Sequence, residues 1–258
     1  MQYYDQYWRE RKECVTEISS LERSLFTPYL GSNALCLDYG CGYGARYGVY
    51  LRDHGLRYRG FDISAEAVAQ ARAHGLSAEL LTEDGKTSLP DGSCDVAVCF
   101  EVFEHLLQPQ VALAEIARVL SPDGVLLASV PNAAHWFQRG EFLVSGFFNP
   151  GGSLWTARKK PWADPHIRFF SPQTFRRFFL ANGFGQVEIL TGPFTLEATP
   201  YVYRQRLLKT VARYVSEPFS WLNQVSPALF GNGLYARAHL KAPEGESWSQ
   251  RRSGKINS

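Results

Sequence analysis

Short apolar runs alternate with amphipathic stretches along most of this chain, and each run ends in polar or glycine-rich sequence. Strands of this kind, separated by helical periods, favour a parallel sheet with helices on both faces. The apolar runs predict strands at residues 34–38, 57–61, 78–81, 94–99, 124–130 and 186–190. The amphipathic stretches predict helices at residues 44–53, 64–74, 108–120 and 172–182.

The junction after the first predicted strand is the most informative part of the sequence. Asp38 ends the strand, and glycines follow at positions 40, 42 and 44 before a helical pattern begins. Glycines let the backbone turn tightly and approach a ligand closely. With Ala45, the spacing also fits a dinucleotide-binding turn or a purely structural one. Asp38 favours a cationic ligand over a pyrophosphate, and S-adenosylmethionine carries both a sulfonium and an ammonium group.

A second acid stands at the end of the second predicted strand. Asp62 closes the run that begins at Arg57, and Ser64 is placed to cap the next helix. An acid at this point of a nucleotide-binding fold can accept hydrogen bonds from both ribose hydroxyls. The alternative is that Asp62 is a further capping residue; its pairing with the glycine turn favours ligand binding.

The chain resembles the class I S-adenosylmethionine-dependent methyltransferases from about Leu35 to Leu190. The glycine turn matches the family's first motif, and Asp62 matches its ribose-binding acid. The resemblance implies an α/β fold: a seven-stranded Rossmann-like sheet, closed by an antiparallel strand at residues 234–240, with N-terminal and inserted lid segments. It also implies that S-adenosylmethionine is bound by Asp38, Gly40, Cys41, Gly42, Asp62, Ile63, Asp84, Gly85, Phe100 and Glu101.

Several segments lie outside the expected core. Residues 1–30 are aromatic near their start and are expected to form a lid, and residues 31–242 form the methyltransferase domain. Insertions at about 132–170 and 193–232 are long enough to be lids or binding loops. Residues 243–258 are polar and are expected to be disordered.

Composition limits the kinds of molecule that we expect this protein to bind. A net charge of +2 over 258 residues gives no argument for nucleic acid, and no apolar run is long enough to span a membrane. The five cysteines lack zinc-site spacing and fall mainly in predicted strands, as expected of reduced thiols in a cytoplasmic protein. We expect a monomer or a homodimer that acts on a small-molecule acceptor.

The acceptor side carries the motif Glu101-x-x-Glu104-His105 after the fourth predicted strand. The motif is expected to open a helix, on which Glu101 and Glu104, or Glu101 and His105, lie on one face. It resembles the motifs of ubiquinone-pathway O-methyltransferases and small-RNA 2′-O-methyltransferases, some of which use it to bind metal. We expect no metal here; if one binds, its ligands are Glu101, Glu104, His105 and His166.

The insertion carries a second resemblance. Residues 129–139 and 162–166 look like those of MetW-type proteins, and equally like methyltransferases of glycan and natural-product pathways. His166, His135 and His105 are candidates for the base that removes a hydroxyl proton, because a histidine titrates near neutral pH. Each is also open to an ordinary structural role.

These features together predict a methyltransferase that transfers a methyl group from S-adenosylmethionine to a small molecule, at oxygen. The alternative is a MetW-like partner protein that keeps the fold and modulates another enzyme. An NAD-dependent oxidoreductase lacks support, because the chain contains no Tyr-x-x-x-Lys pair.

Overall fold

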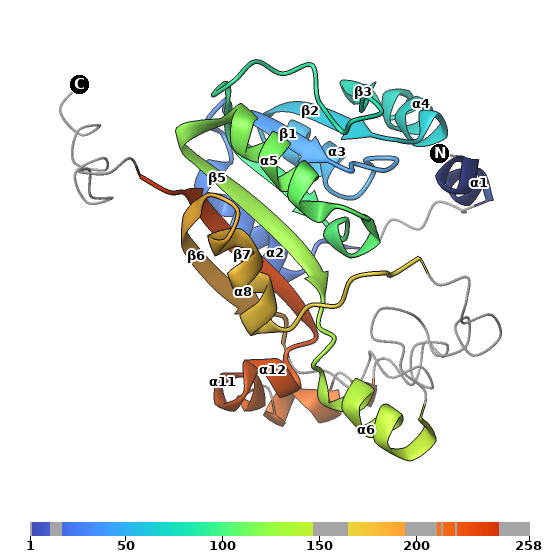
Figure 1. The fold of residues 1–258 in the computed structure, drawn as a ribbon, viewed down its shortest axis with the longest axis vertical. Helices are drawn as coiled ribbons and strands as arrows, with labels where there is room; N and C mark the ends of the chain where they lie inside the picture. The colour runs from blue at the N-terminus through green and yellow to red at the C-terminus, as the bar shows by residue number, and fades with distance from the viewer. Residues whose placement is uncertain are drawn as a thin grey trace.

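A seven-stranded sheet organises the residues that the computed structural model describes, namely 2–10, 17–146, 165–193, 211–212, 214–219 and 221–242. Its strand order is β3-β2-β1-β4-β5-β7-β6 (Figure 1). The strands are β1 (Leu35–Tyr39), β2 (Arg57–Asp62), β3 (Ala78–Leu80), β4 (Cys94–Phe100), β5 (Leu120–Pro131), β6 (Phe184–Thr191) and β7 (Gly233–Leu240).

The sheet is parallel except for β7, which runs antiparallel to both of its neighbours. This topology confirms the predicted methyltransferase-type sheet and its final antiparallel strand. β5 is longer than predicted: it begins at Leu120, which pairs with Cys94 across an irregularity in the register, and not near residue 124. Since the chain order reverses between β1 and β4, the ends of these two strands border the crevice where α/β folds bind ligands.

The helices of the described residues are α1 (Gln2–Glu10), α2 (Ser20–Phe26), α3 (Gly48–Asp53), α4 (Ala65–Ala73), α5 (Pro109–Val119), α6 (Trp136–Ser145), α8 (Pro172–Leu180), α11 (Leu222–Val225) and α12 (Pro227–Phe230). The four predicted helices lie close to their expected positions as α3, α4, α5 and α8, and the further helices form elsewhere in the described residues. Single 3₁₀ turns form η1 (Thr27–Tyr29), η2 (Phe103–His105) and η5 (Glu217–Phe219). The helix predicted at 44–53 begins only at Gly48, because residues 45–47 continue the glycine turn.

Helices cover both faces of the sheet, as predicted. On one face, the aromatic side of α8 and the apolar side of α5 are fully buried, with Phe175, Phe179 and Ile116 at 0 % exposure. Figure 1 shows α5 and α8 on this same face, with β5 visible between them. On the other face, α2, α3 and α4 bury residues such as Phe26 and Leu51.

The N-terminal segment divides into two parts with different environments. α2 belongs to the core, because Phe26 is buried against the sheet, so this part of residues 1–30 is no lid. α1 instead packs beside α4, away from α2 (Figure 1). The expected N-terminal lid is therefore restricted to α1.

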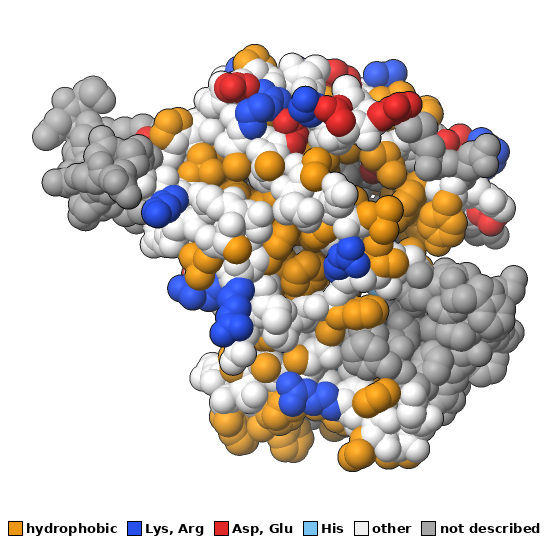
Figure 2. Space-filling model, viewed as in Figure 1, with side chains coloured by type: hydrophobic (Ala, Val, Ile, Leu, Met, Phe, Trp, Pro, Cys, Tyr) orange, Lys and Arg blue, Asp and Glu red, His pale blue; other side chains and the backbone are white. Residues whose placement is uncertain are grey.

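Beyond the end of β5, the chain forms a small helical layer of α6, α11 and α12 (Figure 1). Exposed apolar side chains gather at this end of the molecule (Figure 2), among them Phe142, Leu143, Val144, Trp221 and Val225. Residues 147–164 and 194–210 of the two predicted insertions, and the tail from 243, lie outside the described residues.

Membrane-spanning helices and the state of the cysteines are the two features of the described residues that bear on the composition. No helix there combines the length and apolar character needed to cross a bilayer. The four described cysteines, at positions 36, 41, 94 and 99, are free thiols.

Candidate functional site

The glycine turn after β1 has the backbone geometry that its sequence predicts. Gly40 and Gly42 adopt left-handed φ angles of 79° and 55°. A Cβ atom at Gly40 would lie 2.5 Å from Cγ2 of Val102, and one at Gly42 would lie 2.6 Å from the ring of Trp8. Glycine is therefore required at both positions for conformation and for space.

Asp38 lies beneath this turn and is almost fully buried, with 4 % exposure. The hydroxyl of Tyr58, on β2, donates a 2.7 Å hydrogen bond to Oδ2 of Asp38. Burial raises the pKa of Asp38 to about 7, the Tyr58 hydrogen bond opposes this rise, and the nearby Asp62 adds to it. Tyr58 is a partner that the sequence analysis did not identify, because its distance from Asp38 depends on the register of β1 and β2.

This pKa predicts that cofactor affinity depends on pH. Below pH 7 the Asp38 carboxyl is increasingly protonated and loses its attraction for a cationic ligand. We expect the Kd for S-adenosylmethionine to rise by up to about tenfold per pH unit as the pH falls from 7 to 5.5. Calorimetry over pH 5.5–7.5 measures this, in a range where the cofactor's own amino group stays largely protonated.

Two variants check the origin of that dependence. Asp38→Asn cannot ionise at this position, so its affinity should be lower and its pH profile flatter. Tyr58→Phe removes the opposing hydrogen bond, so the transition should move to higher pH. A Kd that is constant across the whole range in the unmodified protein would contradict the assignment.

Asp62 is held at the end of β2 by the backbone of the neighbouring turns. Its Oδ2 accepts a 2.8 Å hydrogen bond from the Gly42 N–H, and its Oδ1 accepts a 2.9 Å bond from the Ser64 N–H. The carboxyl is buried, which raises its pKa, while these N–H groups oppose the rise. Asp62 thus fixes the glycine turn, and its remaining lone pairs are free to accept from a diol.

The loop after β3 has the position expected of an adenine-binding loop, but its acid is engaged. Thr82 donates a 2.6 Å hydrogen bond to Asp84, and Lys86 forms a 2.9 Å ion pair with it. The Tyr39 hydroxyl donates to the carbonyl of Gly85 at 2.9 Å, which ties the loop to the end of β1. Gly85 is therefore fixed beside the carboxyl ends of β1 and β2, where we expect the cofactor to bind and which we call the cofactor edge. Asp84 is exposed beside this edge.

α1 lies over the glycine turn, and its side chains contact the turn itself, His105 and the start of α4. The ring of Trp8 covers Gly42, and the ring of Tyr4 lies 6.4 Å from that of His105. Asp5 accepts a 2.6 Å hydrogen bond from the Ser64 hydroxyl. Burial is the main cause that raises the pKa of Tyr4 to about 12, with smaller contributions from neighbouring acids.

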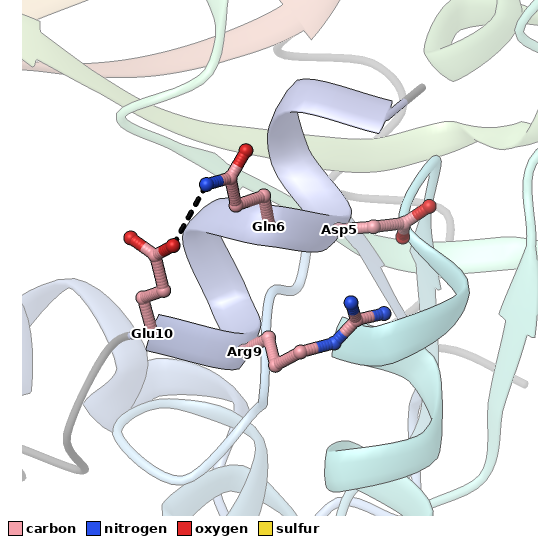
Figure 3. Close-up of a pocket in the computed structure, with 4 residues that line it drawn as sticks. All are labelled: Asp5, Gln6, Arg9 and Glu10. Atoms are coloured by element: carbon pink, nitrogen blue, oxygen red, sulfur yellow. Dashed lines mark hydrogen bonds between the residues drawn. The ribbon is translucent and has the colours of Figure 1, made fainter.

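The outer side of α1 carries a shallow pocket that is separate from this site. Figure 3 shows Asp5 and Arg9 pointing toward α4, while Gln6 and Glu10 point away and share a 2.7 Å hydrogen bond. Arg9 also lies 3.9 Å from Glu66 of α4. These contacts attach α1 to α4 at the rim of the cofactor edge.

The motif that follows β4 does not open a helix, so the predicted sharing of one helical face is wrong. Glu101 has a left-handed φ of 57°, and η2 is a single 3₁₀ turn. Ser129 donates a 2.9 Å hydrogen bond to Oε1 of Glu101. Glu101 is exposed as a residue, but the protein around its carboxyl partly removes that group from water, and this burial raises its pKa. Backbone strain of this kind at a non-glycine residue is typical of functional sites.

Three side chains come together near the end of β4, where we expect the acceptor to bind, and we call them the acceptor group: Glu104, His105 and His166. One potential ligand atom from each lies within 4.8 Å of the others. The Glu104 side chain is 1 % exposed, and neither carboxylate oxygen has a hydrogen-bond partner. Burial, together with the charge of Glu101, raises its pKa well above the ordinary range. Glu101 is absent from this group of described residues, so three of the four ligands named from the sequence are brought together.

His105 is oriented for this group by the chain around His166. Its Nδ1 lies 3.2 Å from the carbonyl of Pro165, and its Nε2 lies 3.8 Å from Oε1 of Glu104. The rings of His105 and His166 are 4.6 Å apart, centre to centre. The backbone carbonyl of Glu104 also accepts from the N–H groups of residues 167 and 168, which holds His166 beside η2.

His135 occupies a different environment from the other two histidines. It precedes α6, is 5 % exposed, and contacts Trp136 at a ring distance of 5.8 Å. Burial lowers its pKa to about 4, and its Nε2 is buried without a hydrogen-bond partner. A histidine with so low a pKa is a weak base at neutral pH, so His135 is the poorest of the three candidates.

Comparison with known proteins agrees with this geometry. The family model described as a methyltransferase domain matches residues 7–189. The chain is 28 % identical over 198 residues to 2-methyl-6-phytyl-1,4-hydroquinone methyltransferase of Synechocystis, covering 72 % of this chain and 56 % of that protein. It is 32 % identical over 167 residues to a ubiquinone biosynthesis O-methyltransferase of Xanthomonas oryzae, covering 62 % and 66 %. The chain thus spans less than two thirds of either relative.

Solved structures show the same fold at low sequence identity. An S-adenosylmethionine-dependent methyltransferase from Archaeoglobus fulgidus superposes with a TM-score of 0.58 at 18 % identity, over 93 % of this chain and 99 % of that one. Phosphoethanolamine N-methyltransferase 2 of Haemonchus contortus, solved with S-adenosylmethionine, gives a TM-score of 0.56 at 15 % identity, over 93 % and 56 %. The chain therefore belongs to the methyltransferase domain family, the class I S-adenosylmethionine-dependent methyltransferases.

Proposed function

We propose that this protein transfers the methyl group of S-adenosylmethionine to a hydroxyl oxygen of a small molecule. The observation that carries the proposal is the buried carboxylate of Glu104, which lacks a hydrogen-bond partner and lies beside the imidazoles of His105 and His166. Groups of this kind suit the removal of a hydroxyl proton during attack on the methyl group. Two relatives named for a hydroquinone and for ubiquinone biosynthesis support a hydroxylated acceptor.

The residues at the cofactor edge have separate tasks in this reaction. Asp62 would accept from the ribose diol, and the turn at Gly40 and Gly42 would bring the backbone close to the ligand. Asp38 would attract the cation. Attack on the sulfonium methyl is an in-line displacement, so the protein mainly orients both reactants and excludes water. That α1 closes over the bound cofactor stays a prediction, supported by the position of Trp8 over Gly42.

We further propose that Glu104, His105 and His166 hold a divalent cation, although the sequence favoured a metal-free site. A carboxylate and two imidazoles are donors that suit several divalent metals. Nδ1 of His105 faces a backbone carbonyl and its Nε2 faces Glu104, so Nε2 is the atom that would bind the cation, an arrangement common around metal sites. When bound, the cation would lower the pKa of the acceptor hydroxyl. A cation would also balance the buried charge of Glu104, which has no hydrogen-bond partner.

Turnover with and without metal tests this function. We expect the protein to form S-adenosylhomocysteine with members of a panel of hydroquinones and other hydroxylated aromatics. A chelator should lower this rate by about 100-fold, and Mg²⁺ or Mn²⁺ should restore it. Cofactor affinity, measured by calorimetry, should not change, because Asp38 and Asp62 belong to a different set of residues.

Other outcomes support other functions. Activity that survives exhaustive chelation would contradict the metal site and leave His166 as a metal-free base. Cofactor binding without turnover on any acceptor would support the alternative of a MetW-like partner protein. Methyl transfer to nitrogen or carbon, identified by mass spectrometry of the product, would contradict the hydroxyl acceptor.

A further inference from the structure

Glu22 of α2 is a buried acid that no step described above uses. It is 1 % exposed and accepts hydrogen bonds from the Ser19 N–H at 2.7 Å, the Tyr47 hydroxyl at 2.7 Å and the Tyr235 hydroxyl at 3.2 Å. Nη2 of Arg46 lies 2.9 Å from its Oε2. Burial alone would raise the pKa of Glu22, but these hydrogen bonds and the Arg46 charge hold it below its ordinary value. The ionised carboxylate therefore joins groups from separate elements at a fixed position.

Arg46 is the member of this group that reaches the surface. It lies in the last part of the glycine turn, just before α3, and its guanidinium lies 4.7 Å from the ring centre of Tyr47. Its Nε is buried, yet 33 % of its side chain is exposed. Since the hydrogen bonds to Glu22 come from Nη2, the other N–H groups of the guanidinium keep donor capacity for an anion.

This exposed part lies near the cofactor edge. The ring of Tyr47, next in sequence, packs 5.0 Å from that of Phe100, the last residue of β4. Glu101 follows Phe100, and the positive charge of Arg46 acts to lower the pKa of its carboxyl. The contact between Tyr47 and Phe100 therefore places the segment of Arg46 beside the end of β4, where Glu101 begins the next loop.

The amino-acid end of S-adenosylmethionine carries an ammonium and a carboxylate. Asp38 and Glu101 suit the ammonium but repel the carboxylate, so recognition of both groups needs a cation close to these acids. We propose that Arg46, oriented by Glu22, binds the carboxylate of the cofactor's methionine part. Arg46 would be a binding residue and Glu22 a positioning residue, since Glu22 acts through the guanidinium that it holds. A guanidinium fixed by one carboxylate loses little further freedom when it binds a second.

The inference rests on the proposed function only in that S-adenosylmethionine is the cofactor. Binding of S-adenosylhomocysteine to the unmodified protein tests that point separately. The experiment compares S-adenosylhomocysteine with its decarboxylated analogue, which keeps the amine and lacks the carboxylate. The unmodified full-length chain should bind the decarboxylated analogue roughly 10–100-fold more weakly in calorimetry.

Substitutions then assign this difference to Arg46. Arg46→Met should weaken S-adenosylhomocysteine by the same roughly 10–100-fold and leave the decarboxylated analogue almost unchanged. Arg46→Lys should restore part of the difference, because it keeps the charge. Glu22→Gln should reduce the difference without abolishing it. Arg52→Met is the matched control: Arg52 lies on the neighbouring α3, pairs with Asp53 at 2.8 Å, and should change neither affinity.

Each contrary result overturns the assignment. Equal affinity of the unmodified protein for both ligands would show that no side chain recognises the carboxylate. Equal weakening of both ligands by Arg46→Met would make Arg46 a structural support of the glycine turn. Unchanged cofactor affinity with a raised KM for a carboxylated acceptor would assign the guanidinium to the acceptor. If Arg46→Met does not fold, the unmodified protein and Arg46→Lys still decide the question.

Discussion

His166→Ala should lower kcat by about 10²–10⁴-fold while cofactor affinity stays unchanged. The substitution removes an imidazole that lies 4.6 Å from the ring of His105 and belongs to the same group as the buried Glu104. Whether His166 holds a cation or takes the acceptor's proton directly, the hydroxyl then loses the means of becoming a better nucleophile. Steady-state kinetics gives kcat, and calorimetry with S-adenosylhomocysteine gives the affinity.

Two conditions separate these roles of His166. If it is a metal ligand, excess Mn²⁺ should restore part of the activity of His166→Ala, because a weakened site is filled by mass action. If it is the base, raising the pH should restore activity instead, since the acceptor then ionises without help. His54→Ala is the control, because this exposed histidine lies beside Tyr50 at the end of α3 and is not a member of the acceptor group.

Comparison with His135→Ala sharpens the result. His135 is buried and apart from the acceptor group, so its loss should reduce the stability of the fold more than kcat. Full activity of His166→Ala at all pH values and metal concentrations would remove this residue from the chemistry. The acceptor group would then serve only to position the substrate.

The sequence was sufficient for the sheet and for the geometry of the glycine turn. Strand positions follow from apolar runs that must be buried, and the turn at Gly40 and Gly42 follows from glycines that no other residue could replace without a clash. Asp38 and Asp62 are predicted ligand-binding residues because an acid at the end of a parallel strand lies at the ligand crevice, and this role stays a prediction. These predictions depend on residues close together in the chain.

The polar networks were not predictable in the same way. The contact between Tyr58 and Asp38 depends on the pairing of two strands, and the contacts of Glu22 join residues up to 213 positions apart. No local pattern indicates such pairs, because each residue type is common on helices and strands for other reasons. The motif at Glu101 was assigned to a helix on its spacing, whereas a left-handed backbone and a single 3₁₀ turn decide its geometry.

His166 shows an intermediate case. Its residue type and its place in the insertion make it a candidate base, and the sequence analysis names it with Glu101, Glu104 and His105 as a ligand should a metal bind. The sequence alone, however, shows no contact that brings it beside Glu104. The structure does so through hydrogen bonds from the N–H groups that follow His166 to the carbonyl of Glu104, at 2.9 Å and 3.0 Å. A long-range backbone contact therefore turns three separate candidates into one group.

Asp62→Ala should weaken the binding of S-adenosylhomocysteine by about 100-fold or more, because two effects add. The ribose diol loses its acceptor, and the N–H groups of Gly42 and Ser64 lose the carboxylate that holds them at 2.8 Å and 2.9 Å. The glycine turn should therefore loosen as well as lose a ligand contact. Calorimetry measures the affinity, and thermal unfolding without ligand reports the loss of the backbone contacts.

Asp95→Ala is the matched control for this substitution. Asp95 also accepts a backbone hydrogen bond, from the Leu35 N–H at 2.9 Å, but it lies at the opposite end of the parallel strands. It should lower stability without affecting the Kd. Asp62→Asn should give an intermediate affinity, because its amide keeps one acceptor oxygen but turns an N–H₂ group toward one of the two backbone donors. Unchanged affinity in Asp62→Ala, or tight binding of NAD by the unmodified protein, would contradict the assignment of this edge to S-adenosylmethionine.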